Sequence, residues 1–193
     1  MNYLCVFCGS NPGARPVYQQ AAQTLGKALV ERGLGLIYGG SKVGLMGTIA
    51  DAVLAAGGQA IGVLPQALAD KELAHQGLNQ LHIVASMHER KALMADLADG
   101  FIAIPGGFGT YEEFCEVLTW AQLGFHQKPC GLLNVEGFFD PLLAMFDRAV
   151  AEAFVHPRHR ALVLADSDCD HLLEQMAAHQ PVILPKWLDR SDL

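Results

Sequence analysis

The chain has 193 residues, of which 51% are apolar and 17% are charged, so it is long enough for one domain with a full hydrophobic core and too short for two ordinary ones. The formal net charge of -7 leaves no basic stripe to neutralise phosphates and argues against nucleic acid as a partner. No run approaches the roughly 18 apolar residues of a membrane span, and residues 1–3 carry no basic region typical of a signal peptide. We therefore expect a cytoplasmic protein without a membrane partner.

Short apolar runs alternate with helical patterns along the chain. Seven runs have the length and composition of strands: residues 3–8, 35–38, 59–64, 80–84, 101–104, 128–133 and 161–164. Helical spacing covers residues 17–31, a segment ending near 56, and residues 86–98, 110–123, 141–154 and 169–178. The tail from about residue 181 is weakly patterned.

This alternation predicts an α/β fold with a parallel sheet and right-handed crossovers. Because the strands are uniformly apolar, helices are expected on both faces of the sheet. The prediction is a single Rossmann-like domain over residues 1–193, with a sheet of about seven strands. In such sheets, ligands bind outside the carboxyl ends of the strands.

The cysteines and histidines give weak signals. Cys5-x-x-Cys8 could form a metal or redox pair, but residues three apart on a strand point to opposite faces, and no second such motif exists. Ordinary buried thiols are the favoured interpretation, and we predict neither a metal site nor a cofactor. His156-Pro157-Arg158-His159-Arg160 resembles a ligand pair or anion patch, yet proline breaks the helical geometry required, which favours a surface loop.

The strongest functional signal is the stretch Pro105-Gly106-Gly107-Phe108-Gly109-Thr110-Tyr111-Glu112-Glu113. It joins a predicted strand to a predicted helix through three glycines within four residues. Glycines let the backbone approach a ligand closely, and the free N–H groups and positive dipole of a helix N-terminus favour phosphate. Glu113, one turn into the helix, would lie near the sugar of a bound nucleotide.

The same residues permit a structural interpretation. Thr110-x-x-Glu113 fits a capping box, as does Ser86-x-x-Glu89. Capping does not explain three clustered glycines, which favours a ligand site. The turn is not a dinucleotide fingerprint, because Glu112 occupies the position of a small residue, and it lacks the Gly-Lys-Ser/Thr ending of a P-loop.

Several polar side chains follow predicted strands and are expected to meet in one cleft: Ser10, Ser41, Arg90, Lys91, Thr110 and Glu113. A phosphate cradle, an arginine and a carboxylate suit cleavage of the glycosidic bond of a nucleotide. Departure of the base leaves positive charge on the ribose carbon, which a carboxylate stabilises directly or by activating water. Arg90 could hold the phosphate or the departing base, and Lys91 could do the same less specifically.

The complete pattern resembles a known family. It comprises Met87-x-x-Arg90-Lys91, Pro105-Gly106-Gly107-x-Gly109-Thr110-x-x-Glu113 and the following segment 116–124, with Cys8-Gly9-Ser10 and Tyr38-Gly39-Gly40 upstream. These residues strongly resemble the Lonely Guy family, over about residues 4–155. Its members are cytokinin-activating phosphoribohydrolases, which cut N6-substituted adenosine monophosphates to the free base and ribose 5-phosphate, and many also accept AMP.

The resemblance implies a Rossmann-like homodimer, catalysis by Arg90 and Glu113, and phosphate binding by Gly107, Gly109 and Thr110. Together with the expected cleft, the matching positions extend the predicted substrate-binding set to Ser10, Gly40, Met87, Lys91, Gly106 and Glu116. Glu116 lies on roughly the same helical face as Glu113, but a solvated or interface carboxylate is equally compatible with its position.

The sequence rejects one activity and leaves three questions open. An older label of the family is lysine decarboxylase, but no lysine here suits a Schiff base with pyridoxal phosphate, so that activity is rejected. A nucleotide sensor without turnover is the alternative to an enzyme, although it would need no carboxylate aimed at the sugar. The sequence separates neither AMP from prenylated AMP as substrate nor direct water attack from a ribosyl-Glu113 intermediate.

Overall fold

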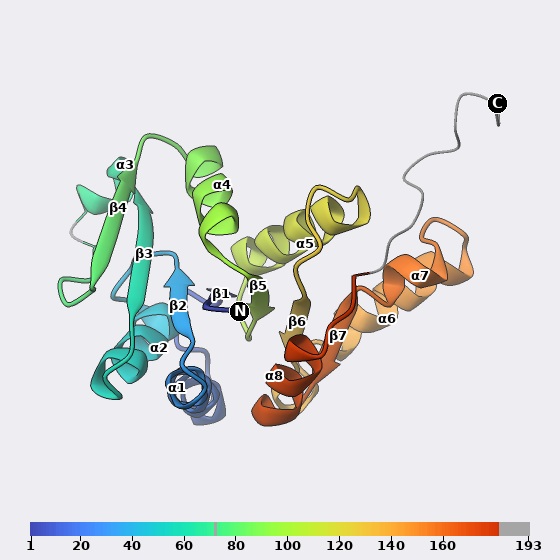
Figure 1. Cartoon of the computed structure of the whole chain (residues 1–193), viewed down its shortest axis with the longest axis horizontal. Coiled ribbons are helices and arrows are strands. Elements are labelled where there is room, and N and C mark those ends of the chain that lie inside the picture. The colour runs from blue at the N-terminus through green and yellow to red at the C-terminus, as the bar shows by residue number, and fades with distance from the viewer. Residues whose placement is uncertain (72, 182–193) are drawn as a thin grey trace.

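The computed structural model describes residues 1–71 and 73–181, which form a parallel sheet flanked by helices (Figure 1). The strands are β1 (Tyr3–Phe7), β2 (Gly35–Tyr38), β3 (Ala60–Pro65), β4 (Gln80–Val84), β5 (Gly100–Ala103), β6 (Cys130–Leu133) and β7 (Val163–Asp166). The main helices are α1 (Pro16–Glu31), α2 (Gly44–Ala55), α4 (Met87–Leu97), α5 (Phe108–Gln122), α6 (Asp140–Ala151) and α8 (Cys169–Ala177). Every strand pair is parallel, as predicted.

Alternating side chains of the central strands supply two separate cores. On β1, Leu4 and Val6 pack on one face with residues of α1, α2 and α8, whereas Cys5 and Phe7 pack on the other with residues of α4 and α5. Figure 1 shows these helices along the two sides of the sheet. Burial on both faces is the reason why the strands are continuous apolar runs.

The strand order β4-β3-β2-β1-β5-β6-β7 places β1 at the centre. The chain first builds outward from β1 to β4 and then returns through α4 to add β5 on the other side of β1. The loops after β1 and β5 therefore leave the sheet at a topological switch point, where open parallel sheets bind their ligands. The glycine-rich turn 105–109 follows β5 at this point.

The edge strand β4 departs from the expectation that every strand is covered on both faces. Its side chains are exposed or half-buried, with Leu81 36% and Ile83 44% exposed. As an edge strand it pairs only with β3, and its sequence alternates polar and apolar residues, as half-exposed strands do.

Three short elements were not predicted from the sequence: α3 (Gln66–Ala69), the 3-10 helix η1 (Val135–Gly137) and α7 (Pro157–Arg160). The last corrects the expected surface loop at residues 156–160. The imidazole Nδ1 of His156 accepts a hydrogen bond from the Arg158 amide at 3.2 Å and caps α7, with Pro157 at its first position. Prediction failed here because a single turn has no periodicity to detect.

Two further sequence expectations concern the C-terminal tail and membrane-spanning segments. The weakly patterned tail, apart from its first residue at 181, lies outside the described residues. Within those that are described, no helix has the length and hydrophobicity needed to span a bilayer.

Candidate functional site

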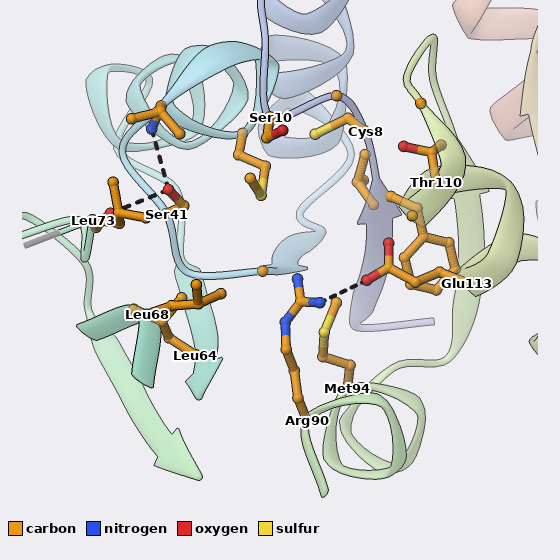
Figure 2. Close-up of a pocket in the computed structure, with 18 of the residues that line it drawn as sticks. Cys8, Ser10, Ser41, Leu64, Leu68, Leu73, Arg90, Met94, Thr110 and Glu113 are labelled. Atoms are coloured by element: carbon orange, nitrogen blue, oxygen red, sulfur yellow. Dashed lines mark hydrogen bonds and ion pairs between the residues drawn. The ribbon is translucent and has the colours of Figure 1, made fainter. Parts of the chain in front are cut away.

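The N-terminus of α5 faces a cavity of about 410 Å³ at the carboxyl ends of β1, β2 and β5 (Figure 2). Gly107 is the N-cap, and within the described chain no side chain caps the helix. The first N–H groups of a helix have no intrahelical acceptor, and they carry the positive end of the dipole. Gly107, Gly109 and Thr110 line this cavity, so the uncapped helix end borders an empty space suited to an anion.

The three glycines of the turn have two different physical roles. A Cβ on Gly106 would collide with the Thr110 hydroxyl and the Gly9 amide, so this glycine permits close packing of the turn against the end of β1. A Cβ on Gly107 or Gly109 would meet no atom of the described residues within 4 Å, and neither glycine has a positive φ. Neither backbone strain nor packing therefore accounts for these two glycines, and both keep the cavity wall bare.

Arg90 reaches the cavity from α4. Ser86 caps this helix by accepting from the Glu89 amide at 3.1 Å, as the predicted capping box requires. The Glu89 carboxylate reaches back one residue further than predicted and accepts from the Ala85 amide at 2.8 Å. The Arg90 guanidinium is buried. Its Nε donates to the Val63 carbonyl at 3.1 Å.

The end of β2 makes room for this guanidinium. A Cβ on Gly39 would collide with Nη2 of Arg90, so the first glycine of the Gly39-Gly40 turn is needed to admit the arginine. Gly39 also lines the cavity, whereas Gly40 is not among its lining residues. The sequence singled out the pair of glycines, but only the structure shows which of them contacts Arg90.

Glu113 is buried and contacts Arg90 in the cavity wall, with Nη1 of Arg90 2.8 Å from Oε1 of Glu113 (Figure 2). Burial raises the pKa of the Glu113 carboxyl, while the charge and hydrogen bond of Arg90 act against that rise. This arrangement replaces the capping box considered for Thr110 and Glu113. Because α5 begins at Phe108, both residues lie inside the helix, and the Glu113 side chain turns to Arg90.

The remaining cavity wall combines a few polar groups with a large apolar surface. The side chains around Arg90, Glu113 and Thr110 include Cys8, Ser10, Ser41, Val43, Met46, Leu64, Leu68, Leu73, Met94 and Phe108. Ser41 is buried and donates to the Leu73 carbonyl at 3.1 Å, and the Lys42 amide donates to the same carbonyl at 2.9 Å. These bonds hold Leu73 against the cavity.

The structure brings together part of the predicted site. Arg90, Glu113, Ser10, Gly107, Gly109 and Thr110 line the cavity. Gly106 borders an adjacent cavity of about 280 Å³ that shares Ser10 and Gly107 with the first. Gly40, Met87, Lys91 and Glu116 are not among the lining residues of the main cavity.

Those last side chains have other environments. Met87 is 46% exposed at the start of α4. The Lys91 ammonium lies 3.0 Å from Glu116 and 2.5 Å from Glu112, so all three side chains form a charged cluster outside the cavity. Glu116 is therefore paired with a lysine and does not face the main cavity.

The apolar lining residues were not anticipated as part of the site. Met46, Leu64, Leu68 and Leu73 come from α2, β3, α3 and the segment that follows α3. In sequence they resemble ordinary core residues, since nothing in their spacing distinguishes a cavity wall from a filled core.

Cys5 and Cys8 are both buried, as the interpretation of ordinary buried thiols predicts. All five cysteines are free, and Cys5 and Cys8 belong to different cores. Within residues 1–71 and 73–181, no group of three His, Cys, Asp or Glu side chains is placed to hold a metal ion.

Comparison with known proteins gives close sequence relatives. Residues 46–176 match a family model described as "Possible lysine decarboxylase". The probable cytokinin riboside 5'-monophosphate phosphoribohydrolase LOGL9 of Oryza sativa subsp. japonica is 50% identical over 93% of this chain and 79% of its own length. Cytokinin riboside 5'-monophosphate phosphoribohydrolase LOG7 of Arabidopsis thaliana is 48% identical over 92% of this chain and 82% of its own length.

Solved structures of more distant proteins share the fold. The molybdenum cofactor binding protein from Rippkaea orientalis has a TM-score of 0.70 at 22% identity, over 92% of this chain and 96% of that one. The Moco carrier protein from Chlamydomonas reinhardtii also has a TM-score of 0.70 at 22% identity, over 92% of this chain and 98% of that one. At this identity the similarity establishes the Rossmann-like architecture.

Proposed function

The chain belongs to the Lonely Guy family of cytokinin riboside 5'-monophosphate phosphoribohydrolases, and from this premise we propose that it hydrolyses the N-glycosidic bond of adenosine 5'-monophosphates. The products are a free base, adenine or an N6-substituted adenine, and ribose 5-phosphate. We assign this activity to a single domain spanning residues 1–193, as the sequence pattern indicates.

The observation that carries the proposal is the buried Arg90–Glu113 pair beside an uncapped helix N-terminus. Glu113 lies four residues after Gly109 on α5, a rise of about 6 Å along a helix at 1.5 Å per residue. A 5'-phosphate at the helix end would therefore place the ribose of the same nucleotide near the Glu113 carboxylate. A protein that only binds the nucleotide would need the helix N-terminus for the phosphate, but no buried carboxylate near the ribose.

In the proposed reaction, the bond between the ribose anomeric carbon and the base nitrogen breaks, and the electron pair leaves with the base. The ionised Glu113 carboxylate stabilises the positive charge that develops on the anomeric carbon, either by activating water or by forming a transient ribosyl ester. In both routes water supplies the new hydroxyl of ribose 5-phosphate and a proton for the base.

Arg90 supports this chemistry in two ways. Its guanidinium stays protonated and presents several donors, which suits it to hold the phosphate or the departing base. Its charge also favours the ionised form of a carboxylate whose pKa burial raises. The pair thus keeps a reactive carboxylate in a site from which water is partly excluded.

The apolar wall supports N6-substituted nucleotides as substrates. Met46, Leu64, Leu68 and Leu73 line the same cavity as Glu113, and its volume is about 410 Å³. An apolar substituent on the base gains free energy when it leaves water for such a surface. The names of the rice and Arabidopsis relatives, cytokinin riboside 5'-monophosphate phosphoribohydrolases, agree with N6-substituted nucleotides as substrates.

We also propose that the protein acts as a cytoplasmic homodimer. Five free cysteines suit a reducing compartment. Exposed apolar side chains, among them Leu81, Ile83, Met87 and Phe108, offer surface for a second copy. Light scattering during size-exclusion chromatography would give twice the chain mass of 20.8 kDa if this assembly is correct.

The decisive experiment measures release of free base from AMP and from isopentenyl-AMP in the presence of EDTA, for the wild type, Glu113→Gln and Glu174→Gln. We expect turnover by the wild type and its loss in Glu113→Gln with nucleotide binding retained. Glu174→Gln, at an exposed position of α8 outside the cavity, should keep the activity of the wild type. Tight binding of both nucleotides without base release would reject the enzyme in favour of a sensor.

A further inference from the structure

Helices α4 and α5 are joined by two adjacent sets of ionic contacts. Inside the cavity, Arg90 of α4 pairs with Glu113 of α5. Immediately outside it, the next residue of α4, Lys91, pairs with Glu112 and Glu116 of α5. The sequence suggested Lys91 and Glu116 as substrate-binding residues, but the structure directs both away from the cavity.

Lys91 is well suited to hold the two helices in register. Its side chain is only 12% exposed, and its ammonium lies 2.5 Å from Oε1 of Glu112 and 3.0 Å from Oε1 of Glu116. Two of its three N–H donors are thereby used for carboxylates one helical turn apart. Partial burial disfavours the charge, yet the hydrogen bonds of the two carboxylates prevail and raise the pKa of Lys91.

We propose that Lys91, with Glu112 and Glu116, is a positioning group that keeps Arg90 opposite Glu113, and that it does not bind the substrate phosphate. This inference rests on the proposed function. Arg90 and Lys91 are consecutive on α4, and Glu112 and Glu113 are consecutive on α5. Sliding or rotation of one helix that separates Arg90 from Glu113 must therefore also strain the Lys91 contacts.

Phosphate binding by Lys91 would require a different arrangement. The ammonium would have to leave two carboxylates that it contacts and enter a cavity that its side chain does not line. The uncapped N-terminus of α5 already supplies N–H donors for an anion. Lys91 therefore acts on the reaction through the geometry of Arg90 and Glu113.

The kinetic test compares Lys91→Met, Lys91→Arg, Glu112→Gln/Glu116→Gln and the triple variant that combines Lys91→Met with both glutamines. In Lys91→Met we expect kcat for AMP to fall by at least ~10-fold and KM to change by less than ~3-fold, because misplacement of reacting groups affects the chemical step. Lys91→Arg should retain most of kcat, because arginine can still contact both carboxylates.

The triple variant tests whether the three residues act as one unit. If they do, its loss of kcat equals that of Lys91→Met, because each change already breaks the same connection. Losses that multiply would overturn the proposal. So would a KM for AMP that rises ~10-fold with kcat unchanged in Lys91→Met, which is the signature of a lost ground-state contact to the phosphate.

A second readout does not depend on turnover. The titratable groups that interact electrostatically with Glu113 are Arg90 and Lys91 from α4, Glu112 on its own helix, and the thiols of Cys5 in β1 and Cys8 just after it. Of these, the Glu112 charge raises the pKa of Glu113, so its simple removal would lower that pKa. Separation of Arg90 from Glu113 would instead raise it.

Carbon-13 NMR of the glutamate carboxyls, assigned with Glu113→Gln, measures this pKa directly. In Glu112→Gln/Glu116→Gln we expect the pKa of Glu113 to rise, and a fall or no change would overturn the positioning role. Absence of base release by the wild type would reject the proposed function alone, since the NMR result still decides whether the cluster holds Arg90 against Glu113.

Discussion

At the scale of single residues, the site depends on what surrounds two charged side chains. Arg90 is admitted by Gly39 and fixed by the Val63 carbonyl, and Glu113 is buried opposite it. The sequence identified both residues from their positions after predicted strands. It could not show that they contact each other, because 23 residues separate them along the chain.

The first prediction concerns the pH dependence of catalysis. Glu113 acts as a carboxylate, and burial raises its pKa above the ordinary 4.5 although Arg90 opposes the rise. We expect kcat/KM to fall as the pH falls, with an apparent pKa above 4.5. The affinity of Glu113→Gln for AMP over the same pH range serves as a control for titration of the phosphate. An acid limb below 4.5 would contradict this assignment.

The second prediction separates the roles of the glycines. Gly107→Ala places a methyl group in open space, so the free energy of unfolding should stay within ~0.5 kcal/mol of the wild type. The same methyl group intrudes on the bound phosphate, so AMP affinity should fall ~10-fold or more, equivalent to ~1.4 kcal/mol. Isothermal calorimetry and urea unfolding measure the two quantities.

Gly106→Ala is the matched comparison. Its methyl group would collide with Thr110 and the Gly9 amide, so stability should fall by about 1–3 kcal/mol, as in other overpacked positions. If Gly107→Ala proved the more destabilising of the two, the missing side chain at Gly107 would serve folding, and its role in phosphate binding would be rejected.

At the scale of elements, local contacts decide where each element begins and which direction its end faces. Ser86 and Glu89 define the start of α4, as predicted from the sequence. The same pattern at Thr110 and Glu113 does not cap α5, because that helix starts two residues earlier, at Phe108. A capping signature therefore identifies the region of a helix start, while tertiary contacts decide whether the side chains cap or serve the site.

The third prediction concerns the start of the central strand. The Asp99 carboxylate accepts hydrogen bonds from the amides of Asn2 and Tyr3, at 2.5 and 3.1 Å, and thereby fixes the N-terminal end of β1 next to β5. These hydrogen bonds, chiefly the one from the Asn2 amide, lower the pKa of Asp99 from 3.8. The resulting stabilisation is present above pH 3.8 and is lost as the pH falls through the lowered pKa.

Asp99→Asn should therefore be less stable than the wild type at pH 7, and the difference should shrink as the pH falls below 3.8. Urea unfolding at several pH values measures it. Asp96→Asn, an exposed neighbour on α4, is the control and should leave the profile unchanged. A difference that grew on acidification would refute the proposed linkage.

At the scale of the whole molecule, the strand order creates the site. The order in which strands are added to the sheet reverses at β1, which brings the loops after β1 and β5 together. Residues after β2 and on α4 complete the cavity from one side. Ligand binding here contacts segments from both halves of the sheet. Nucleotide binding should therefore stabilise the fold as a unit.

The fourth prediction uses this linkage. For Glu113→Gln, which should bind AMP without cleaving it, AMP at 100 times its Kd should add about 2.7 kcal/mol to the free energy of unfolding. Adenosine at the same concentration should add much less, because it has no phosphate for the α5 N-terminus. Thermal and urea unfolding with each ligand test this. Equal stabilisation by both would argue against a phosphate subsite.

By itself, the sequence determined the α/β architecture, all seven strands, the main helices and the glycine turn as the centre of the site. These features are local: periodicity and apolar runs report burial, and glycine reports close approach of the backbone. The family resemblance rests on this turn together with the motifs at residues 8–10, 38–40, 87–91 and 116–124.

Only the tertiary structure decided how the charges are paired and what lines the cavity. Lys91 follows Arg90 in sequence, yet one side chain enters the cavity and the other joins Glu112 and Glu116 outside it. Leu64, Leu68 and Leu73 look like core residues and instead form a wall. Both outcomes depend on contacts between segments far apart in the chain, and sequence spacing carries no information about the space that such contacts leave open.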